Sequence, residues 1–250
     1  MFTRADLAAK LAERGLRPKR ALGQNFLVDP NFLEAIVRDA EIGPGDGVVE
    51  IGAGPGGLTD RLAERAARVW AFDVDPDILG VARELLSGRR NVSLIKADGA
   101  DFERHVDPAG VARLKVVANL PYGPWRRLVL RLLSTRLPVE SYTLMLQRDV
   151  VDRLRAAPGT RDYGPMGVIV QATCEIRLVR RAGKGLFLPP PRIESAVVQL
   201  RRTAPPRDLE AVEARLQSLF AGRRKKSKEA GGRRVETVPP GELFALASKP

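Results

Sequence analysis

Cysteine and histidine are almost absent from this chain. Its 250 residues include a single cysteine, Cys174, and a single histidine, His105. A disulfide framework, a zinc site built from cysteine and histidine, and a Ser-His-Asp triad therefore each lack components. We expect no metal site, and the scarcity of cysteine is typical of the reducing cytoplasm in which we expect the protein to act.

Long apolar runs are missing as well. No stretch approaches the run of about 18 apolar residues that a membrane-spanning helix needs. Charged residues occur throughout residues 1–20, which is unlike the apolar segment of a signal peptide. No heptad pattern or exposed apolar stripe is evident. We therefore expect no membrane partner and a monomeric protein.

Positive charge, in contrast, is abundant. The chain has 42 lysines and arginines against 30 aspartates and glutamates, which gives a formal net charge of +12. Such an excess favours a polyanionic partner such as a nucleic acid. The hydrophobic content of 44% is sufficient to fill the core of one large domain with a small appendage.

Predicted strands and helices alternate along most of the chain. A helix is expected after Asp29-Pro30, which combines a helix N-cap with proline at the first helical position. The expected strands are 48–51, 68–73, 92–97, 114–118 and 142–146, and the helices that follow begin near 58 and span 76–87, 124–134 and 150–156. Because helices separate the strands, we expect a parallel sheet. Two further expected strands, 167–179 and 193–201, complete a seven-stranded, Rossmann-like α/β fold.

The composition changes near residue 204. The segment 203–207 is rich in proline, and after it come a predicted helix at 208–220, a basic run and a tail with several glycines and prolines. We therefore expect a main domain over residues 1–204 and a small, basic, helical C-terminal module over residues 205–250.

A glycine-rich loop, 52–57, follows the first predicted strand. Glycines at Gly52 and Gly54 allow backbone amides to approach a nucleotide-like ligand. The spacing fits both a dinucleotide and S-adenosylmethionine, and a purely structural turn is the alternative. Asp73 ends the next strand, where a carboxylate accepts hydrogen bonds from ribose hydroxyls. Asp98 ends the third strand and is expected to accept from an adenine amine, or else to cap the turn before Gly99.

The string Asn119-Leu120-Pro121-Tyr122 directly follows the fourth predicted strand. An adenine amino nitrogen is a poor nucleophile, because its lone pair is delocalised into the ring. The Asn119 side-chain oxygen and the Leu120 carbonyl are able to accept its two hydrogens and favour a more tetrahedral nitrogen. Pro121 stiffens the turn, and Tyr122 offers a face for stacking of an extruded base. The alternative is a loop whose tyrosine only packs.

Together these strings resemble the rRNA adenine N6-dimethyltransferases, the family of the kasugamycin-sensitivity enzymes. The resemblance covers about residues 17–201, and its motifs stand in family order. They are LGQNFL at 22–27, EIGAGPGGLT at 50–59, NLPY at 119–122, MLQRDVVDRL at 145–154, YGPMGVIVQ at 163–171 and FLPPPRIESAVVQL at 187–200. The resemblance implies an S-adenosylmethionine-dependent methyltransferase fold and an rRNA substrate.

The resemblance also assigns roles to individual residues. The cofactor site would include Gln24, Asn25, Leu27, Gly52, Gly54, Asp73, Asp98 and Asn119. The catalytic residues would be Asn119, Leu120, Pro121, Tyr122 and Phe187. In this assignment Phe187 closes the second face of the target adenine; packing beneath the loop is its alternative role. Gln24 and Asn25 have an alternative role in a turn that caps the helix after Asp29.

Three features depart from the family pattern. Asp73 stands where the family usually has glutamate, and Gly123-Pro124-Trp125 replaces the usual Asn-Ile-Ser after the NLPY string. The C-terminal module is shortened. Within it the expected RNA-binding residues are Arg223, Arg224, Lys225 and Lys226. Other cations expected to contact phosphates are Lys19, Arg20, Arg126, Arg127, Arg131, Arg180, Arg181, Lys184 and Lys228.

The leading hypothesis is dimethylation of N6 in two adjacent adenines of the 3′-terminal hairpin of 16S rRNA, within a pre-ribosomal small subunit. Three alternatives remain. The first is a large-subunit rRNA methyltransferase that confers macrolide resistance. The second is a ribosome-assembly factor that binds RNA without catalysis. The third is a nicotinamide dehydrogenase, which lacks a suitably placed proton donor because His105 stands in a polar stretch away from the predicted strand ends.

Overall fold

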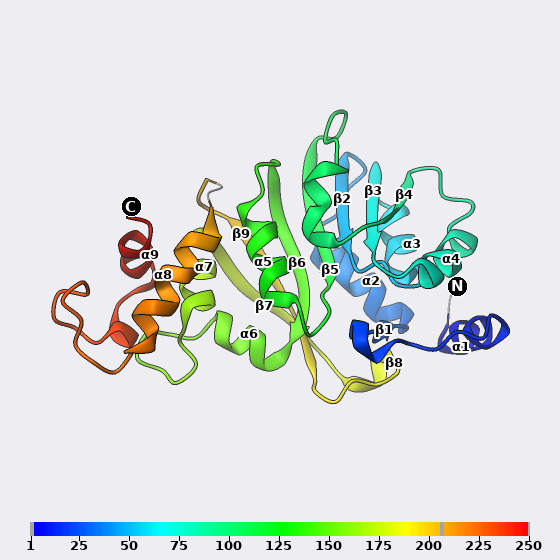
Figure 1. Ribbon diagram of the computed structural model, residues 1–250. Coiled ribbons are helices and arrows are strands. Elements are labelled where there is room, and N and C mark those ends of the chain that lie inside the picture. The colour runs from blue at the N-terminus through cyan, green and yellow to red at the C-terminus, as the bar shows by residue number, and fades with distance from the viewer. Residues whose placement is uncertain (1–2, 206–207, 250) are drawn as a thin grey trace.

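The computed structural model describes residues 3–205 and 208–249, and its centre is a seven-stranded sheet (Figure 1). The strand order is β4-β3-β2-β5-β6-β9-β7. The strands are β2 (Asp46–Ile51), β3 (Arg68–Asp73), β4 (Val92–Lys96), β5 (Arg113–Asn119), β6 (Val139–Gln147), β7 (Cys174–Ala182) and β9 (Ser195–Arg202). The structure therefore confirms the predicted seven-stranded α/β fold.

The direction of the strands brings the predicted site residues to one edge. β2 to β6 are mutually parallel, whereas β9 runs antiparallel to both β6 and β7. The carboxyl ends of β2, β3 and β5 carry the glycine loop, Asp73 and Asn119 respectively. In open α/β sheets, ligands bind at this edge.

Two helices pack on one face of the central strands. They are α2 (Pro30–Asp39) and α3 (Gly57–Ala63), whose apolar side chains join Val48 and Val117 in a buried cluster. α4 (Pro76–Leu85) packs beside β3 and β4. The expected start of α2 is confirmed, because the Asp29 side chain accepts a hydrogen bond of 2.8 Å from the Phe32 amide.

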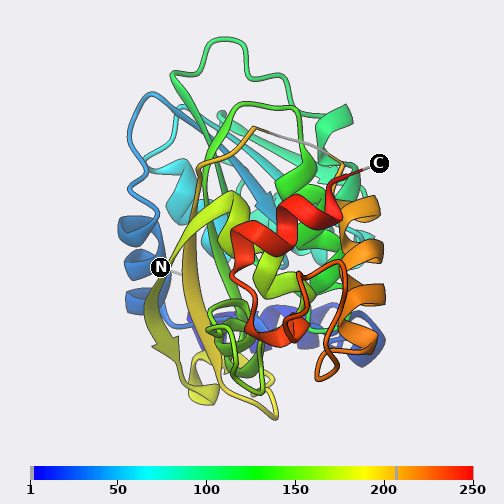
Figure 2. The same cartoon turned by 90° about the vertical axis from the view of Figure 1, so that its left-hand side faces the viewer.

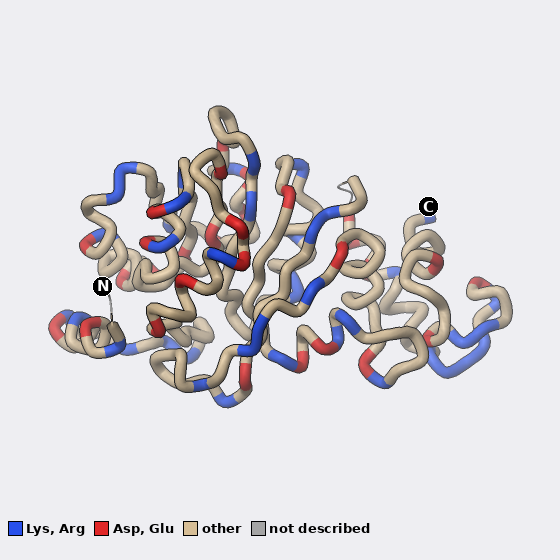
Figure 3. Tube along the Cα trace, turned by 180° about the vertical axis from the view of Figure 1, so that it is seen from behind, with Lys and Arg blue, Asp and Glu red and all other residues tan. Residues whose placement is uncertain are grey.

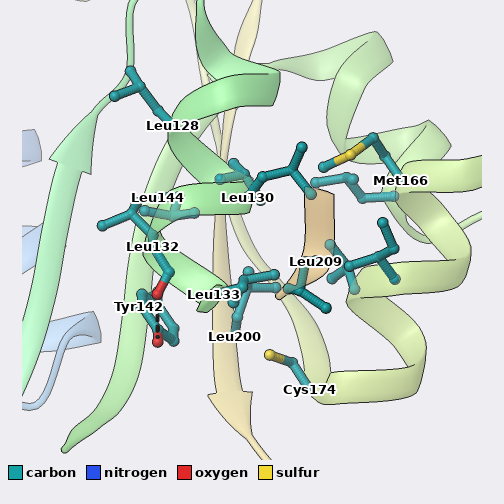
Figure 4. Packing of buried hydrophobic residues seen from close by; sticks show 14 of the residues in the cluster. Leu128, Leu130, Leu132, Leu133, Tyr142, Leu144, Met166, Cys174, Leu200 and Leu209 are labelled. Carbon is teal, nitrogen blue, oxygen red and sulfur yellow. Dashed lines mark hydrogen bonds between the residues drawn. The ribbon is translucent and has the colours of Figure 1, made fainter. Parts of the chain in front are cut away.

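The opposite face is covered by α5 (Trp125–Ser134), α6 (Arg148–Leu154), α7 (Pro165–Thr173), α8 (Leu209–Ala221) and α9 (Pro240–Ala247). Figure 2 shows α9 beside α7 and α8. Leu209 of α8 lies close to Leu133 and Cys174 in the main buried cluster (Figure 4). The C-terminal helices thus extend the same core. The division at residue 204 stays a prediction, and Pro206, Arg207 and Pro250 lie outside the described residues.

One predicted element is wrong in its first half. Residues 167–179 were expected to form a strand, but residues up to Thr173 belong to α7, and β7 begins only at Cys174. Every residue from Met166 to Val170 is buried, so the segment carries no helical alternation of apolar and polar residues. Pro165 at the first helical turn is the local signal that favoured a helix.

The N-terminal segment, for which the sequence predicts only a basic character, contains a helix and a short strand. α1 (Arg4–Glu13) begins with a capping box at Thr3, and its Leu7 and Leu11 pack with Ile78 and Val81 of α4. A two-stranded sheet joins β1 (Phe26–Leu27) to β8 (Phe187–Leu188). Short 3-10 helices span Arg20–Leu22, Gly99–Arg104, Lys184–Leu186 and Val235–Thr237. Among the described residues, no helix is long and apolar enough to cross a membrane.

Candidate active site

The glycine loop after β2 favours glycine for two reasons: its backbone has positive φ angles, and neighbouring atoms lie close to it. Gly52 and Gly54 have φ angles of +82° and +53°. A Cβ atom at Gly52 would lie 3.1 Å from the carbonyl oxygen of Asn119, and one at Gly54 would lie 3.1 Å from the Phe26 ring. The loop is therefore held closely between β5 and β1.

Asp73 is oriented by the backbone on both sides. Its Oδ2 accepts a hydrogen bond of 2.9 Å from the Gly54 amide, and its Oδ1 accepts one of 2.9 Å from the Asp75 amide. Burial raises the pKa of Asp73, although these bonds oppose the shift. The Val74 amide also acts on this carboxylate and opposes the rise of its pKa, and the role of Asp73 toward a ribose hydroxyl stays a prediction. The shorter aspartate is thus fixed in place by the loop that it faces.

Two buried oxygen atoms near the glycine loop make no well-aligned hydrogen bond within the described residues. They are Glu50 Oε2 and Thr59 Oγ1. Burial raises the pKa of Glu50 to about 8; the neighbouring Thr59 hydroxyl opposes this rise, and the negative charge of Asp73 adds to it. The two side chains therefore lie close together, and a protonated carboxyl and a hydroxyl are able to bond to one another. The sequence reading did not single out Glu50, although it begins the motif that contains the glycine loop.

Both carboxylate oxygens of Asp98 accept hydrogen bonds within the protein. Its Oδ1 caps the 3-10 helix that follows, accepting from the Ala100 amide at 2.9 Å, and its Oδ2 accepts from Arg127 Nη1 at 2.7 Å. Although burial opposes the shift, these two bonds lower the pKa of Asp98. The carboxylate is therefore charged, and Arg127 of α5 occupies one of the acceptor sites predicted for an adenine amine.

Asn119 ends β5 with its side-chain amide oriented by a distant segment. Its Nδ2 donates a hydrogen bond of 3.2 Å to the Asn25 carbonyl. Its Oδ1, at the opposite end of the planar amide, accepts no hydrogen bond from the described residues. The Leu120 amide donates to the Met145 carbonyl at 3.1 Å, which ties the loop to β6. The acceptor required by the predicted chemistry is therefore available.

Tyr122 is half-buried and anchored through its hydroxyl group. Its Oη lies 2.9 Å from Oγ of Ser195, the first residue of β9. Burial raises the pKa of Tyr122, against the opposing effect of this bond. Pro121 is partly exposed beside it. The structure thus brings Asn119, Leu120, Pro121 and Tyr122 together in one loop at the edge of the sheet.

Phe187 and Leu27 are backbone neighbours in the β1–β8 sheet. The side chain of Phe187 is only 1% exposed and packs in the cluster that contains Leu27, Met145 and Val197. This burial matches the packing alternative for Phe187. Its role against the target base stays a prediction, as does the contribution of Leu27 to the cofactor site.

Gln24 and Asn25 do not cap α2. The Gln24 side-chain oxygen accepts from the Lys19 amide at 2.7 Å, and its nitrogen donates to Asp75 at 2.7 Å. The Asn25 side chain donates to the Gly23 carbonyl at 3.1 Å. Both residues shape the segment that reaches Asn119, and their contacts with a cofactor stay predictions.

The predicted RNA-binding residues divide into two groups. Arg223 donates to Glu236 at 2.8 Å and to the carbonyls of Arg161 and Thr160 at 3.0 and 2.9 Å. Its guanidinium is therefore engaged within the protein. Arg224, Lys225 and Lys226 are exposed and have no side-chain partner among the described residues. Figure 3 shows this basic run in the loop after α8.

Several other cations expected to meet phosphates are paired. Carboxylates neutralise Lys19, Arg126, Arg127, Arg131 and Arg180. Within the described ranges, Arg20, Arg181, Lys184 and Lys228 have no such partner. The same ranges contain no cluster of three or more histidine, cysteine, aspartate or glutamate side chains suited to a metal ion.

Comparison with known proteins identifies relatives of this chain. Ribosomal RNA small subunit methyltransferase A of Geobacillus sp. (strain WCH70) is 37% identical over 239 residues, covering 94% of this chain and 82% of that protein. The Moorella thermoacetica protein of the same name is 43% identical over 206 residues, covering 79% and 72% of the two chains.

Two solved structures extend the comparison. A dimethyladenosine transferase from Plasmodium falciparum superposes with a TM-score of 0.75 at 21% identity, covering 88% of this chain and 95% of that one. The 23S rRNA methyltransferase ErmE gives a TM-score of 0.64 at 28% identity, covering 90% and 100%. Both have the fold expected for S-adenosylmethionine-dependent methyltransferases.

The family model described as Ribosomal RNA adenine dimethylase matches residues 15–234, a span that contains the glycine loop, the NLPY string and the basic run. The close approach that Gly52 and Gly54 allow, and the Asp73 carboxylate held beside the loop, fit the expected S-adenosylmethionine. This match confirms the expected enzyme class: the chain belongs to the ribosomal RNA adenine dimethylase family of S-adenosylmethionine-dependent methyltransferases.

Proposed function

We propose that this protein transfers two methyl groups to N6 of each of two adjacent adenines in the 3′-terminal hairpin of 16S rRNA. In this proposal it acts as a cytoplasmic monomer on a pre-ribosomal small subunit during ribosome biogenesis. The observation that supports the chemistry best is the Asn119 amide, whose Nδ2 is held by the Asn25 carbonyl while its Oδ1 stays available. The names of the small-subunit relatives support the choice of RNA.

The residues of the loop activate the acceptor nitrogen by position and electrostatics. Asn119 Oδ1 and the Leu120 carbonyl accept the two hydrogens of the adenine amine, and Tyr122 stacks on the extruded ring. The nitrogen lone pair then faces the methyl group that S-adenosylmethionine supplies. When bound, this donor would supply the methyl group by breakage of its S–CH3 bond as the N–C bond forms, the electron pair staying on the sulfur of S-adenosylhomocysteine; the neutral amine nitrogen thereby becomes positively charged and releases one proton to solvent. Histidine is not needed as a base.

A second methylation requires that the monomethylated amine still fit. Gly123 is exposed, and apart from its two chain neighbours no described residue would lie within 4 Å of a Cβ atom there, so we propose that this position leaves room for the added methyl group. Replacing Gly123 with valine should lower the rate of the second methylation more than that of the first. Quantifying monomethyl- and dimethyladenosine over time tests this, and equal losses in both steps would contradict it.

The RNA-binding surface that we propose combines two segments far apart in the sequence. Arg223 holds the carbonyls of Thr160 and Arg161, so the loop after α6 lies beside the basic run. This arrangement groups exposed cations that have no carboxylate partner among the described residues. They are Arg161, Arg224, Lys225 and Lys226. Clustered cations of this kind contact phosphates and favour recognition of RNA shape.

The decisive experiment is methyl transfer from labelled S-adenosylmethionine to unmethylated small subunits and, in parallel, to large-subunit rRNA. The products are digested to nucleosides and identified by mass. Dimethyladenosine from small subunits alone supports the proposal. Label in large-subunit rRNA would instead favour the resistance-type alternative that the sequence leaves open, an activity that the name of the similar protein ErmE also describes. Label in neither, with the cofactor still bound, would favour a non-catalytic assembly factor.

A further inference from the structure

The segment 19–25, here called the strap, crosses the loop that carries the proposed chemistry. A Cβ atom at Gly23 would lie 3.6 Å from the Tyr122 amide nitrogen and 3.7 Å from Pro121 Cβ. Two residues later, the Asn25 carbonyl accepts the Asn119 Nδ2 hydrogen bond. The conformation of the strap therefore bears directly on the orientation of the catalytic amide.

Asp75 fastens the strap to the start of α4. The Asp75 side chain is fully buried, and it accepts hydrogen bonds of 2.7 Å from both Lys19 Nζ and Gln24 Nε2. It also caps α4 by accepting from the Asp77 amide at 3.1 Å. Gln24 closes the strap on itself, because its side-chain oxygen accepts from the Lys19 amide. A buried carboxylate with charge-assisted bonds is a strong and specific anchor.

The same carboxylate belongs to a continuous network. The Asp75 amide donates to Asp73 Oδ1, the carboxylate proposed for the cofactor ribose. In the other direction, Gln24 precedes Asn25, whose carbonyl holds Asn119. Three hydrogen bonds and two short covalent stretches, within Asp75 and from Gln24 to Asn25, thus connect the proposed ribose site to the proposed acceptor of the adenine amine.

We infer that Lys19, Gln24 and Asp75 are positioning residues that hold the strap so that Asn119 presents its oxygen to the target amine. An amide side chain presents either its oxygen or its nitrogen after a half-turn about a soft torsion. The bond from Nδ2 to the Asn25 carbonyl selects one of these orientations. The inference rests on the proposed function, since it gives the strap a role in that reaction.

Two substitutions of the same kind separate this role from general stability. Lys19→Met removes the strap's two ion pairs at the start of α4, with Asp75 at 2.7 Å and with Asp77 at 2.8 Å. Lys10→Met removes another ion pair between the N-terminal segment and α4, at 2.7 Å to Glu84, outside the network. We expect Lys19→Met and Gln24→Met to lower kcat by about 10- to 100-fold, because small misplacements at a reacting centre have large effects. The KM for S-adenosylmethionine should change less, and Lys10→Met should leave kcat near the wild-type value.

The expected coupling to Asn119 gives a second readout. In single-turnover assays, Lys19→Met should cause no further loss when Asn119 is already alanine. The same loss in both backgrounds would overturn the inference. So would equal kcat values for Lys19→Met and Lys10→Met, or a change confined to the cofactor KM.

Failure of the proposed function is distinguishable from failure of this inference. A wild-type protein that methylates no rRNA contradicts the proposed function. The strap is then tested by hydrogen exchange at the Gly23 and Gln24 amides, which bond to the carbonyls of Arg20 and Lys19. Lys19→Met should speed this exchange at least tenfold relative to Lys10→Met, by about 1.4 kcal/mol of lost protection. Equal exchange would overturn the role of Asp75 as the anchor.

Discussion

The hydroxyl oxygen of Tyr122 lies 2.9 Å from Oγ of Ser195, a residue that is only 1% exposed. Tyr122 stands in the loop after β5, whereas Ser195 begins β9, on the far side of β6. The bond therefore anchors the tyrosine through its hydroxyl group, at the far end of the ring from the backbone. Stacking on a base and anchoring by the hydroxyl are separable functions of one side chain.

Substitutions at these two positions should separate those functions. Tyr122→Phe and Ser195→Ala should each lower kcat/KM for RNA by about fivefold, equivalent to about 1 kcal/mol for one hydrogen bond. The double variant should be no worse than either, because both remove the same bond. Tyr122→Ala should cost more, since stacking contributes about 1–3 kcal/mol per base. Steady-state assays measure these values, and a Tyr122→Phe protein as poor as Tyr122→Ala would assign the main role to the hydroxyl.

Replacing Asn119 with alanine should lower turnover by orders of magnitude while cofactor affinity stays within a few-fold of wild type. The reason is that the lost acceptor matters most when the amine becomes tetrahedral in the transition state. Single-turnover methylation and calorimetric titration with S-adenosylmethionine give the two quantities. A collapse of cofactor binding would show that Asn119 serves the cofactor rather than the adenine.

The parts of the fold that could be predicted are those with a strong local signal. The run from Asp46 to Asn119 alternates short buried strands with helices, and glycine or proline marks most of the boundaries. The first half of 167–179 was mistaken for a strand, because a helix buried on all sides has no polar face. The sequence analysis predicted no helix at α1, although Thr3 and Asp6 form a capping box that marks its start.

The site divides in a similar way. The glycine loop and the NLPY string are contiguous, so their chemistry could be read from residue order. The hydrogen bonds that Gln24 and Lys19 donate to Asp75 join residues 51 and 56 positions apart, and only the folded chain reveals them. For Arg223 the sequence predicted too much. A basic run predicts phosphate contacts for each of its residues, but in the folded chain the Arg223 guanidinium donates to the carbonyls of Thr160 and Arg161.

Arg127 should weaken cofactor binding by competing for Asp98. Its Nη1 donates to Asp98 Oδ2 at 2.7 Å, the oxygen otherwise available to an adenine amine. Exposed ion pairs contribute about 0–1 kcal/mol, so Arg127→Met should tighten S-adenosylmethionine binding by up to about fivefold. Arg131→Met, on the same helix and paired with Glu210, is the control. Calorimetry measures both, and weaker binding in Arg127→Met would mean that the arginine supports the site.

Neighbouring residues of the basic run should behave differently. Each phosphate contact contributes about 0.7–0.9 to the slope of log K against log salt concentration. Arg224→Ala should lower this slope for rRNA binding by about one contact and leave the melting temperature near wild type. Arg223→Ala should instead lower the melting temperature, because its guanidinium joins Glu236 to the loop after α6. Binding titrations at several salt concentrations, with thermal unfolding, test the distinction; identical behaviour of the two variants would contradict it.

Glu50 should make the protein less stable as the pH rises. In the folded chain, burial raises the pKa of its carboxyl to about 8, above the ordinary value of 4.5. Between these values the folded state keeps a proton that the unfolded state releases, so the free energy of unfolding falls as pH increases. The contribution is fully present below about pH 4.5 and is lost through about pH 8. Glu50→Gln should remove this part of the slope and increase stability at pH 8 by on the order of a few kcal/mol.

Urea unfolding at several pH values measures this effect. Glu13→Gln is the matched control, because it makes the same substitution at an exposed position of α1 and should leave the slope unchanged. Comparing the two variants removes the contribution of other titrating groups that they share. A wild-type slope that persists in Glu50→Gln would mean that Glu50 is ionised in the folded protein, and its buried carboxylate would then need a cationic partner that the described residues do not supply.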